Sequence, residues 1–182
     1  MNEAQLKHKN EEFIHKIKRE NPNFFDGLKE GQSPEFFMLA CSDSRVSPSV
    51  ITQMPLGEMF VHRNIANQVD QEDESFSASL YYALVHLNIK KIIIKGHTDC
   101  GGVKAAWSDG VDEALSGWIG KVKQSLPDKT NANDVHIDEL TKMNVQKQVA
   151  RIKDHPVFKA YGEGVQVTGY LYHVATGELE KL

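Results

Sequence analysis

The chain has 182 residues, of which 40% are hydrophobic and 25% charged, and its formal net charge is −4. This composition is typical of a globular protein and predicts one domain over residues 1–182. The sequence shows no strongly basic face and no apolar run long enough to span a bilayer, so we expect neither nucleic acid nor a membrane as partner.

The first thirty residues predict a helical arm. Residues 2–20 form a polar helix with a narrow apolar stripe, which Asn21-Pro22 ends. The stripe consists of Leu6, Phe13, Ile14 and Ile17. So thin a stripe needs a surface to lie on, either in its own domain or on a partner subunit. Because this polar start is unlike a secretory signal, we expect a cytoplasmic location.

The middle of the chain alternates between predicted strands and helices. Phe36–Ala40 is a buried strand, and Ser47-Pro48 opens a short helix over residues 48–53. A second strand spans Glu58–His62, and Asp73–Asn88 has the periodicity of a helix. Lys91–Lys95 is a third predicted strand, whose continuous β-branched run, Ile92–Ile94, suits a parallel strand covered on both faces.

The remainder continues the alternation. Helices are predicted over residues 101–107, 114–126 and 137–153, a loop over residues 128–134, a strand over Val165–His173 and a turn at residues 175–178 before a short last strand. In the helix over residues 137–153, the residues expected to face inward are Leu140, Met143, Val149 and Ile152. This order predicts an α/β fold with three layers, α/β/α, around a mostly parallel sheet.

The two cysteines each follow a predicted strand. Cys41 comes after the first strand, and His97 and Cys100 follow the third. Ligands of open α/β sheets gather outside the carboxyl ends of the strands, and parallel neighbours bring those ends together. Two thiols and one imidazole suit zinc. His-x-x-Cys alone is a weak signal for a metal site. The cysteine at the end of the first strand, with an aspartate and an arginine close behind it, makes the signal more specific.

Asp43 and Arg45 stand two and four residues after Cys41. Three protein ligands leave a fourth metal position open. Asp43 can fill that position and close the site, or accept a hydrogen bond from a water on the metal. Arg45 would hold the carboxylate away from the metal through a bidentate pair. The residues alone leave both roles of Asp43 open.

Three segments, in this order and spacing, resemble the β-class carbonic anhydrases. They are GQSPEFFMLACSDSRVSPSVI, PLGEMFVHRNIANQV and IIIKGHTDCGGVKAA, and the likeness extends from about Gln32 to Leu179. The resemblance implies that Cys41, His97 and Cys100 bind one Zn²⁺ per chain and that Asp43 and Arg45 form the catalytic dyad. It also implies reversible hydration of carbon dioxide to bicarbonate and a proton by zinc-bound hydroxide.

The same resemblance implies a substrate pocket and an assembly. A glutamine and an apolar wall shape the carbon dioxide pocket of the family, partly across a subunit interface. The matching residues here are Gln32, Phe60, Ile65, Tyr82 and Gly101. The arm, residues 1–30, would pack on a partner subunit in a homodimer or a homotetramer.

One subgroup of the family is allosteric and stores bicarbonate beside a tryptophan, an arginine and a tyrosine. Met38 stands at the tryptophan position, whereas Val46, Arg63 and Tyr172 are present. The resemblance is therefore closer to the open, non-allosteric type.

Two other functions fit the same site. The first is hydrolysis of carbonyl sulfide or carbon disulfide, which the family also contains. The second is a catalytically silent binding module in which zinc stabilises the fold and Asp43 stays on the metal. The set Gln32, Phe60 and Tyr82 favours carbon dioxide.

Overall fold

The computed structural model of the protein describes residues 2–108, 111–129 and 135–182. They fall into two compact units, Met1–Ser33 and Pro34–Leu182. The predicted loop over residues 128–134 lies largely outside the described residues, since residues 130–134 are not among them. No helix in the described part of the chain combines the length and apolarity needed to cross a membrane.

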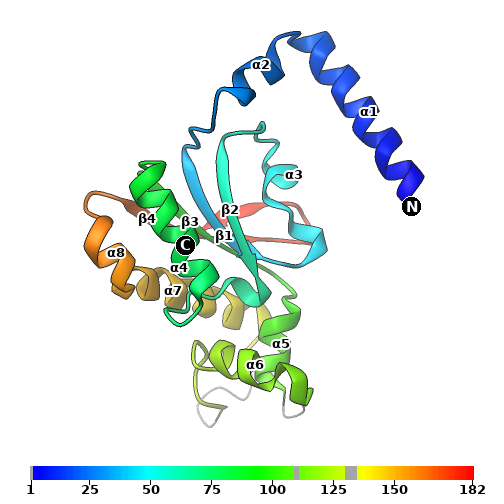
Figure 1. The fold of residues 1–182 in the computed structure, drawn as a ribbon. Helices are drawn as coiled ribbons and strands as arrows, with labels where there is room; N and C mark the ends of the chain where they lie inside the picture. Colours follow the sequence, from blue (N-terminus) through cyan, green and yellow to red (C-terminus); the bar gives the residue numbers. More distant parts are fainter. Residues whose placement is uncertain (1, 109–110, 130–134) are drawn as a thin grey trace. The chain divides into compact units, whose positions relative to one another are not determined.

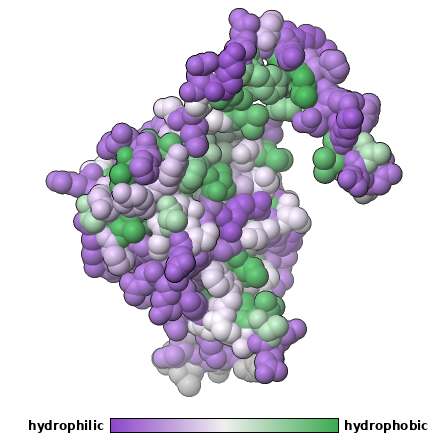
Figure 2. Space-filling view, in the orientation of Figure 1, coloured by the Kyte–Doolittle hydropathy of each residue, from purple (hydrophilic) through white to green (hydrophobic). Residues whose placement is uncertain are grey.

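The first unit holds two helices, α1 (Glu3–Glu20) and α2 (Phe24–Lys29). The predicted helix over residues 2–20 is confirmed, and α2 was not predicted. Asn2 and Gln5 cap α1 reciprocally, each side chain accepting the backbone N–H of the other. Neither helix buries a residue, and Leu6 of the apolar stripe is 66% exposed. Figure 2 shows apolar side chains among the polar ones on these helices.

The second unit is built on a five-stranded sheet in the order β2-β1-β3-β4-β5 (Figure 1). Four strands are parallel, and β5 is antiparallel to β4. The strands are β1 (Phe36–Cys41), β2 (Met59–Asn64), β3 (Lys91–His97), β4 (Gln166–Tyr172) and β5 (Leu179–Lys181). The predicted strands are confirmed, and β1 and β3 extend further, so that Cys41 and His97 are their last residues.

Helices cover both faces of this sheet, as the three-layer prediction requires. They are α3 (Pro48–Thr52), α4 (Glu74–Tyr81), α5 (Gly101–Trp107), α6 (Ser116–Lys123), α7 (Ile137–Asp154) and α8 (Pro156–Tyr161). The chain moves from β1 outward to β2, then back across β1 to β3. Since crossovers between parallel strands are right-handed, α3 and α4 lie on opposite faces (Figure 1).

The main core lies between the sheet and α4 and α7. It includes Phe37 and Leu39 of β1, Ile92 and Ile94 of β3, and side chains of both helices. Gly169 lets α7 approach β4, because a Cβ there would lie 2.9 Å from Val145. A second buried cluster gathers around Cys41 and Cys100 at the carboxyl edge of the sheet.

Three helices differ from the prediction. The helix predicted over residues 114–126 is shorter, since α6 spans Ser116–Lys123 after a 3₁₀ turn, Glu113–Leu115. The helix predicted over Asp73–Asn88 ends its regular part at Tyr81 and continues as a π-helical turn, Tyr82–His86. In α7, the prediction for Met143 was wrong, because its side chain is 39% exposed. The polar Asn144 and Gln148 are buried instead. They hydrogen-bond to each other, and both hydrogen-bond to the side chain of Gln68.

Candidate metal centre

The candidate site lies where the strand order changes direction. The crossover from β1 leads outward to β2, whereas the next leads to β3 on the other side of β1. Such switch points open a crevice outside the carboxyl ends of the two strands, since the following loops leave toward opposite faces. The last residues of β1 and β3, Cys41 and His97, therefore meet there.

Cys41, His97 and Cys100 form one buried cluster. Their ligand atoms, two Sγ and one imidazole nitrogen, all lie within 4.8 Å of one another. Cys100 immediately precedes α5, so the short loop after β3 returns it toward His97. The backbone N–H of Ala66 donates to Sγ of Cys41 at 3.4 Å. The structure thus brings together the three side chains that the sequence singled out.

His97 is oriented as a ligand. Its Nδ1 lies 2.9 Å from the carbonyl oxygen of Thr98. A carbonyl oxygen can only accept, so Nδ1 carries the proton and Nε2 of the neutral ring keeps a free lone pair. Among the described residues Nε2 is fully buried with no hydrogen-bond partner. A buried lone pair without a donor fits a metal ion, and the bond at Nδ1 is the outer-shell contact typical of ligating histidines.

The two thiols shift each other's pKa in opposite directions. A hydrogen bond from Cys100 lowers the pKa of Cys41, and the neighbouring imidazole of His97 and backbone N–H groups lower it further against the effect of burial. The same bond, together with burial and the charge of Cys41, raises the pKa of Cys100. One thiolate forms readily, and a second becomes favourable when a cation lies between the two sulfurs. The donor set therefore fits a divalent cation that prefers sulfur and nitrogen.

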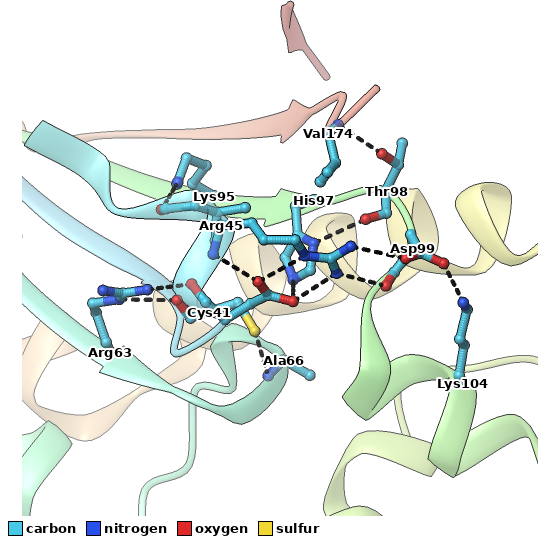
Figure 3. Close-up of polar contacts among 12 residues, drawn as sticks. Cys41, Arg45, Arg63, Ala66, Lys95, His97, Thr98, Asp99, Lys104 and Val174 are labelled. Atoms are coloured by element: carbon cyan, nitrogen blue, oxygen red, sulfur yellow. Dashed lines mark hydrogen bonds and ion pairs between the residues drawn. The ribbon is translucent and has the colours of Figure 1, made fainter. Parts of the chain in front are cut away.

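Asp43 and Arg45 occupy the turn that follows β1. Figure 3 shows the side chain of Arg45 in the same region as His97 and Asp99. Nε and Nη2 of Arg45 donate to the two oxygens of Asp43 at 3.0 and 2.7 Å, and the backbone N–H of Arg45 donates to Oδ1 at 2.9 Å. Oδ2 of Asp43 lies 3.8 Å from Nε2 of His97. The bonds from Arg45 outweigh burial and hold the pKa of Asp43 well below its usual value.

Arg45 is itself held from the other side. Its Nη1 donates to the carboxylate of Asp99 at 3.0 Å, and Lys104 also binds that carboxylate. Asp99 has a left-handed backbone, with φ of 60°, and its N–H donates to Asp138 at 3.0 Å. The guanidinium therefore bridges the loops that follow β1 and β3.

Two further cations reach the turn after β1. Arg63 of β2 donates to the carbonyl oxygens of Cys41 and Asp43 at 2.9 and 2.7 Å. Lys95 of β3 donates to the carbonyl oxygen of Val46 at 2.6 Å. Burial and the charge of Arg63 lower the pKa of Lys95 to about 8, partly offset by Cys41.

Of the residues predicted to line a substrate pocket, Ile65 and Gly101 lie near the carboxyl ends of the strands, just after β2 and at the start of α5. Phe60 is the second residue of β2 and pairs with Phe37, four residues before Cys41, so the structure does not bring it to the metal cluster of its own chain. Phe60 and Tyr82 stack with ring centroids 5.8 Å apart, and Tyr82 is exposed. Ile65 is exposed and follows β2, and the indole of Trp118 donates to its carbonyl oxygen. At Gly101, the first residue of α5, an added Cβ would meet no atom within 4 Å. Gln32 belongs to the other unit, Met1–Ser33.

Sequence reasoning overlooked the support that Lys95, Ala66 and Asp138 give to this site. A lysine inside the apolar run IIIKGH was the one available signal. The backbone N–H of Ala66 donates to Cys41, and Asp138 accepts from the backbone N–H of Asp99. Contacts of backbone N–H groups cannot be predicted from residue types.

The sequence profile of the family described as carbonic anhydrase matches residues 36–179. A carbonic anhydrase of Candida albicans is 35% identical over 184 aligned residues, which cover 95% of this chain. One of Emericella nidulans is 34% identical, again over 95% of this chain. The chain spans 65% of the length of the first relative and 80% of the second.

Solved structures show the same likeness. One of two tetrameric beta-carbonic anhydrases of the filamentous ascomycete Sordaria macrospora superimposes with a TM-score of 0.90. It is 29% identical, and the match covers 98% of this chain and 95% of that one.

Proposed function

Because this chain belongs to the β class of the carbonic anhydrase family, we propose that it hydrates carbon dioxide reversibly to bicarbonate and a proton, with zinc as cofactor. One observation carries the proposal. Two buried thiols and a histidine nitrogen that no described residue hydrogen-bonds converge where the carboxyl ends of β1 and β3 meet.

Cys41, His97 and Cys100 would hold the zinc ion. When bound, zinc supplies a Lewis acid that makes water a potent nucleophile near neutral pH. Asp43 would accept a hydrogen bond from the attacking water and so orient it toward the substrate. Arg45 keeps the Asp43 carboxylate in place as an acceptor, since it binds both carboxylate oxygens. This pairing supports the open, non-allosteric type.

Carbon dioxide is small and uncharged, so its pocket needs apolar walls rather than charges. We assign these walls to Phe60, Ile65 and Tyr82, and the floor to the backbone at Gly101. The exposure of Ile65 and Tyr82 in the single chain and the open space at Gly101 support this assignment. We assign the glutamine of the family's pocket to Gln32, as the sequence resemblance implies.

The assembly we propose is a homodimer or a homotetramer, with residues 1–30 as an arm of the single domain that packs on a partner subunit. The uncovered stripe of α1 and the tetrameric relative support it. A cytoplasmic location accords with two cysteines that serve as ligands rather than as a disulfide.

Stopped-flow hydration of carbon dioxide on zinc-loaded protein, from neutral to alkaline pH, tests the function. We expect turnover that requires stoichiometric zinc. Protein with one zinc ion per chain and no hydration at any of these pH values would contradict the proposal. Parallel assays with carbonyl sulfide and carbon disulfide separate this function from hydrolysis of those substrates.

A further inference from the structure

Lys95 is a lysine buried deep in the sheet, two residues before His97. Lys95 is only 1% exposed, and lysines are seldom buried so fully unless they form an ion pair. Within the described residues its ammonium has no carboxylate at salt-bridge distance. It donates to the carbonyl oxygen of Val46 at 2.6 Å and lies 5.6 Å from the ring centre of Tyr172.

The strand register explains how this lysine reaches the turn after β1. Ala40 of β1 pairs with Arg63 of β2 on one side and with Lys95 of β3 on the other. Register partners in parallel strands point to the same face of the sheet. The small side chain of Ala40 leaves room for both long side chains to run toward the carboxyl edge, where the turn lies.

The two cations hold different parts of that turn. Arg63 binds the carbonyl oxygens of Cys41 and Asp43, at the start of the turn. Lys95 binds that of Val46, at its end. The turn itself is a single 3₁₀ turn, Ser44–Val46, closed by a bond from the N–H of Val46 to the carbonyl oxygen of Asp43 at 3.2 Å.

We propose that Lys95 is a positioning residue for the hydration reaction: it fixes Val46 and thereby keeps Asp43 and Arg45 engaged beside His97. This inference rests on the proposed function. If Lys95 is removed, the turn stays attached at its start but its end is released. The carbonyl oxygen of Val46 then lacks its charged donor, a bond stronger than one between neutral groups. Small displacements of reacting groups have large effects on rate.

The test compares Lys95→Met with Lys91→Met, both zinc-loaded. Lys91 lies four residues earlier on the same strand and pairs with Glu35 at the surface, so it controls for loss of a lysine from β3. In Lys95→Met we expect one zinc per chain and faster hydrogen–deuterium exchange confined to peptides covering residues 42–47. We expect kcat to fall about ten- to a hundredfold with KM changed less. Lys91→Met should match the wild type in all four measurements.

Wild-type exchange at residues 42–47 or wild-type kcat in folded Lys95→Met would overturn the proposal. Loss of zinc from Lys95→Met would also overturn it, because Lys95 would then support the metal ligands. Faster exchange throughout the protein would do the same, because Lys95 would then support the core. If Lys95→Met does not fold, the same measurements on Lys95→Gln decide; failure of both to fold also overturns it. A wild type without hydration activity refutes the proposed function, while the exchange comparison still shows whether Lys95 holds the turn.

Discussion

The carboxylate of Asp43 lies beside the imidazole of His97, with Oδ2 at 3.8 Å from Nε2. The same oxygen accepts a hydrogen bond from Arg45 at 2.7 Å. Asp43 is therefore adjacent to the metal site while its position is fixed by a residue outside it. Its role can be tested separately from that of the ligands.

We expect Asp43→Ala to keep its zinc and lose about a hundredfold or more in turnover, since a positioned proton acceptor is lost. Stopped-flow assays with metal analysis check this. Asp112→Ala is the matched control, because Asp112 caps a 3₁₀ turn in the same way, accepting the N–H of Ala114 at 2.9 Å. Unchanged turnover in Asp43→Ala would exclude a catalytic role for this residue.

Cys41→Ser should lose the metal, because a hydroxyl does not supply the thiolate that the cluster requires. Metal analysis and thermal unfolding with and without a chelator check this. A chelator should lower the unfolding temperature of the wild type, since the bound ion stabilises only the folded state, and should leave that of Cys41→Ser unchanged. Stoichiometric zinc in Cys41→Ser would contradict the ligand assignment.

Gly101→Ala should fold normally yet impair hydration. The added methyl meets no protein atom within 4 Å, but it enters the space assigned to the substrate. We expect kcat/KM to fall about tenfold, the effect of one methyl group in a fitted pocket. Gly120→Ala in α6, where an added Cβ is equally free of contacts, is the control and should keep full activity. Wild-type kcat/KM in Gly101→Ala would remove Gly101 from the pocket.

Asp70 should contribute to stability at neutral pH and lose that contribution in acid. Burial alone would raise its pKa, but hydrogen bonds from Lys121 and from the N–H of Glu72 hold the pKa below its usual value. A lowered folded-state pKa means that the contribution is complete above the unfolded-state value of about 4 and disappears as the pH falls through the folded-state pKa.

Urea unfolding of Asp70→Asn and the wild type at several pH values measures this. The two should differ at neutral pH and converge in acid. Asp26→Asn is the control, because Asp26 forms an exposed pair with Lys29 and such pairs contribute little. A difference between Asp70→Asn and the wild type that persists in acid would show that the charge of Asp70 is not its source.

The sequence predicted the sheet and the metal cluster because both depend on apolar runs and on the residues that end them. Cys41 directly follows such a run and His97 comes three residues after another, and the parallel order brings the ends of their strands together. Met143 was misplaced because the buried face of α7 carries amides, and a pattern of apolar residues does not identify Asn144 or Gln148 as buried. The role of Lys95 could not be predicted, because its hydrogen-bond acceptor is a backbone carbonyl group. The room for its side chain also depends on the small size of Ala40 in the neighbouring strand.

The switch point between β1 and β3 also bears on how the protein matures. Cys41 and His97 are separated in the chain by α3, β2, α4 and most of β3, so no local hairpin or single βαβ unit contains both. Closing that long connection costs chain entropy before the cluster exists. Before β1 and β3 have paired, the chain therefore presents the ion with Cys41 alone or with His97 and Cys100, and not with all three together. Metal uptake with full affinity reports that the central strands have already assembled.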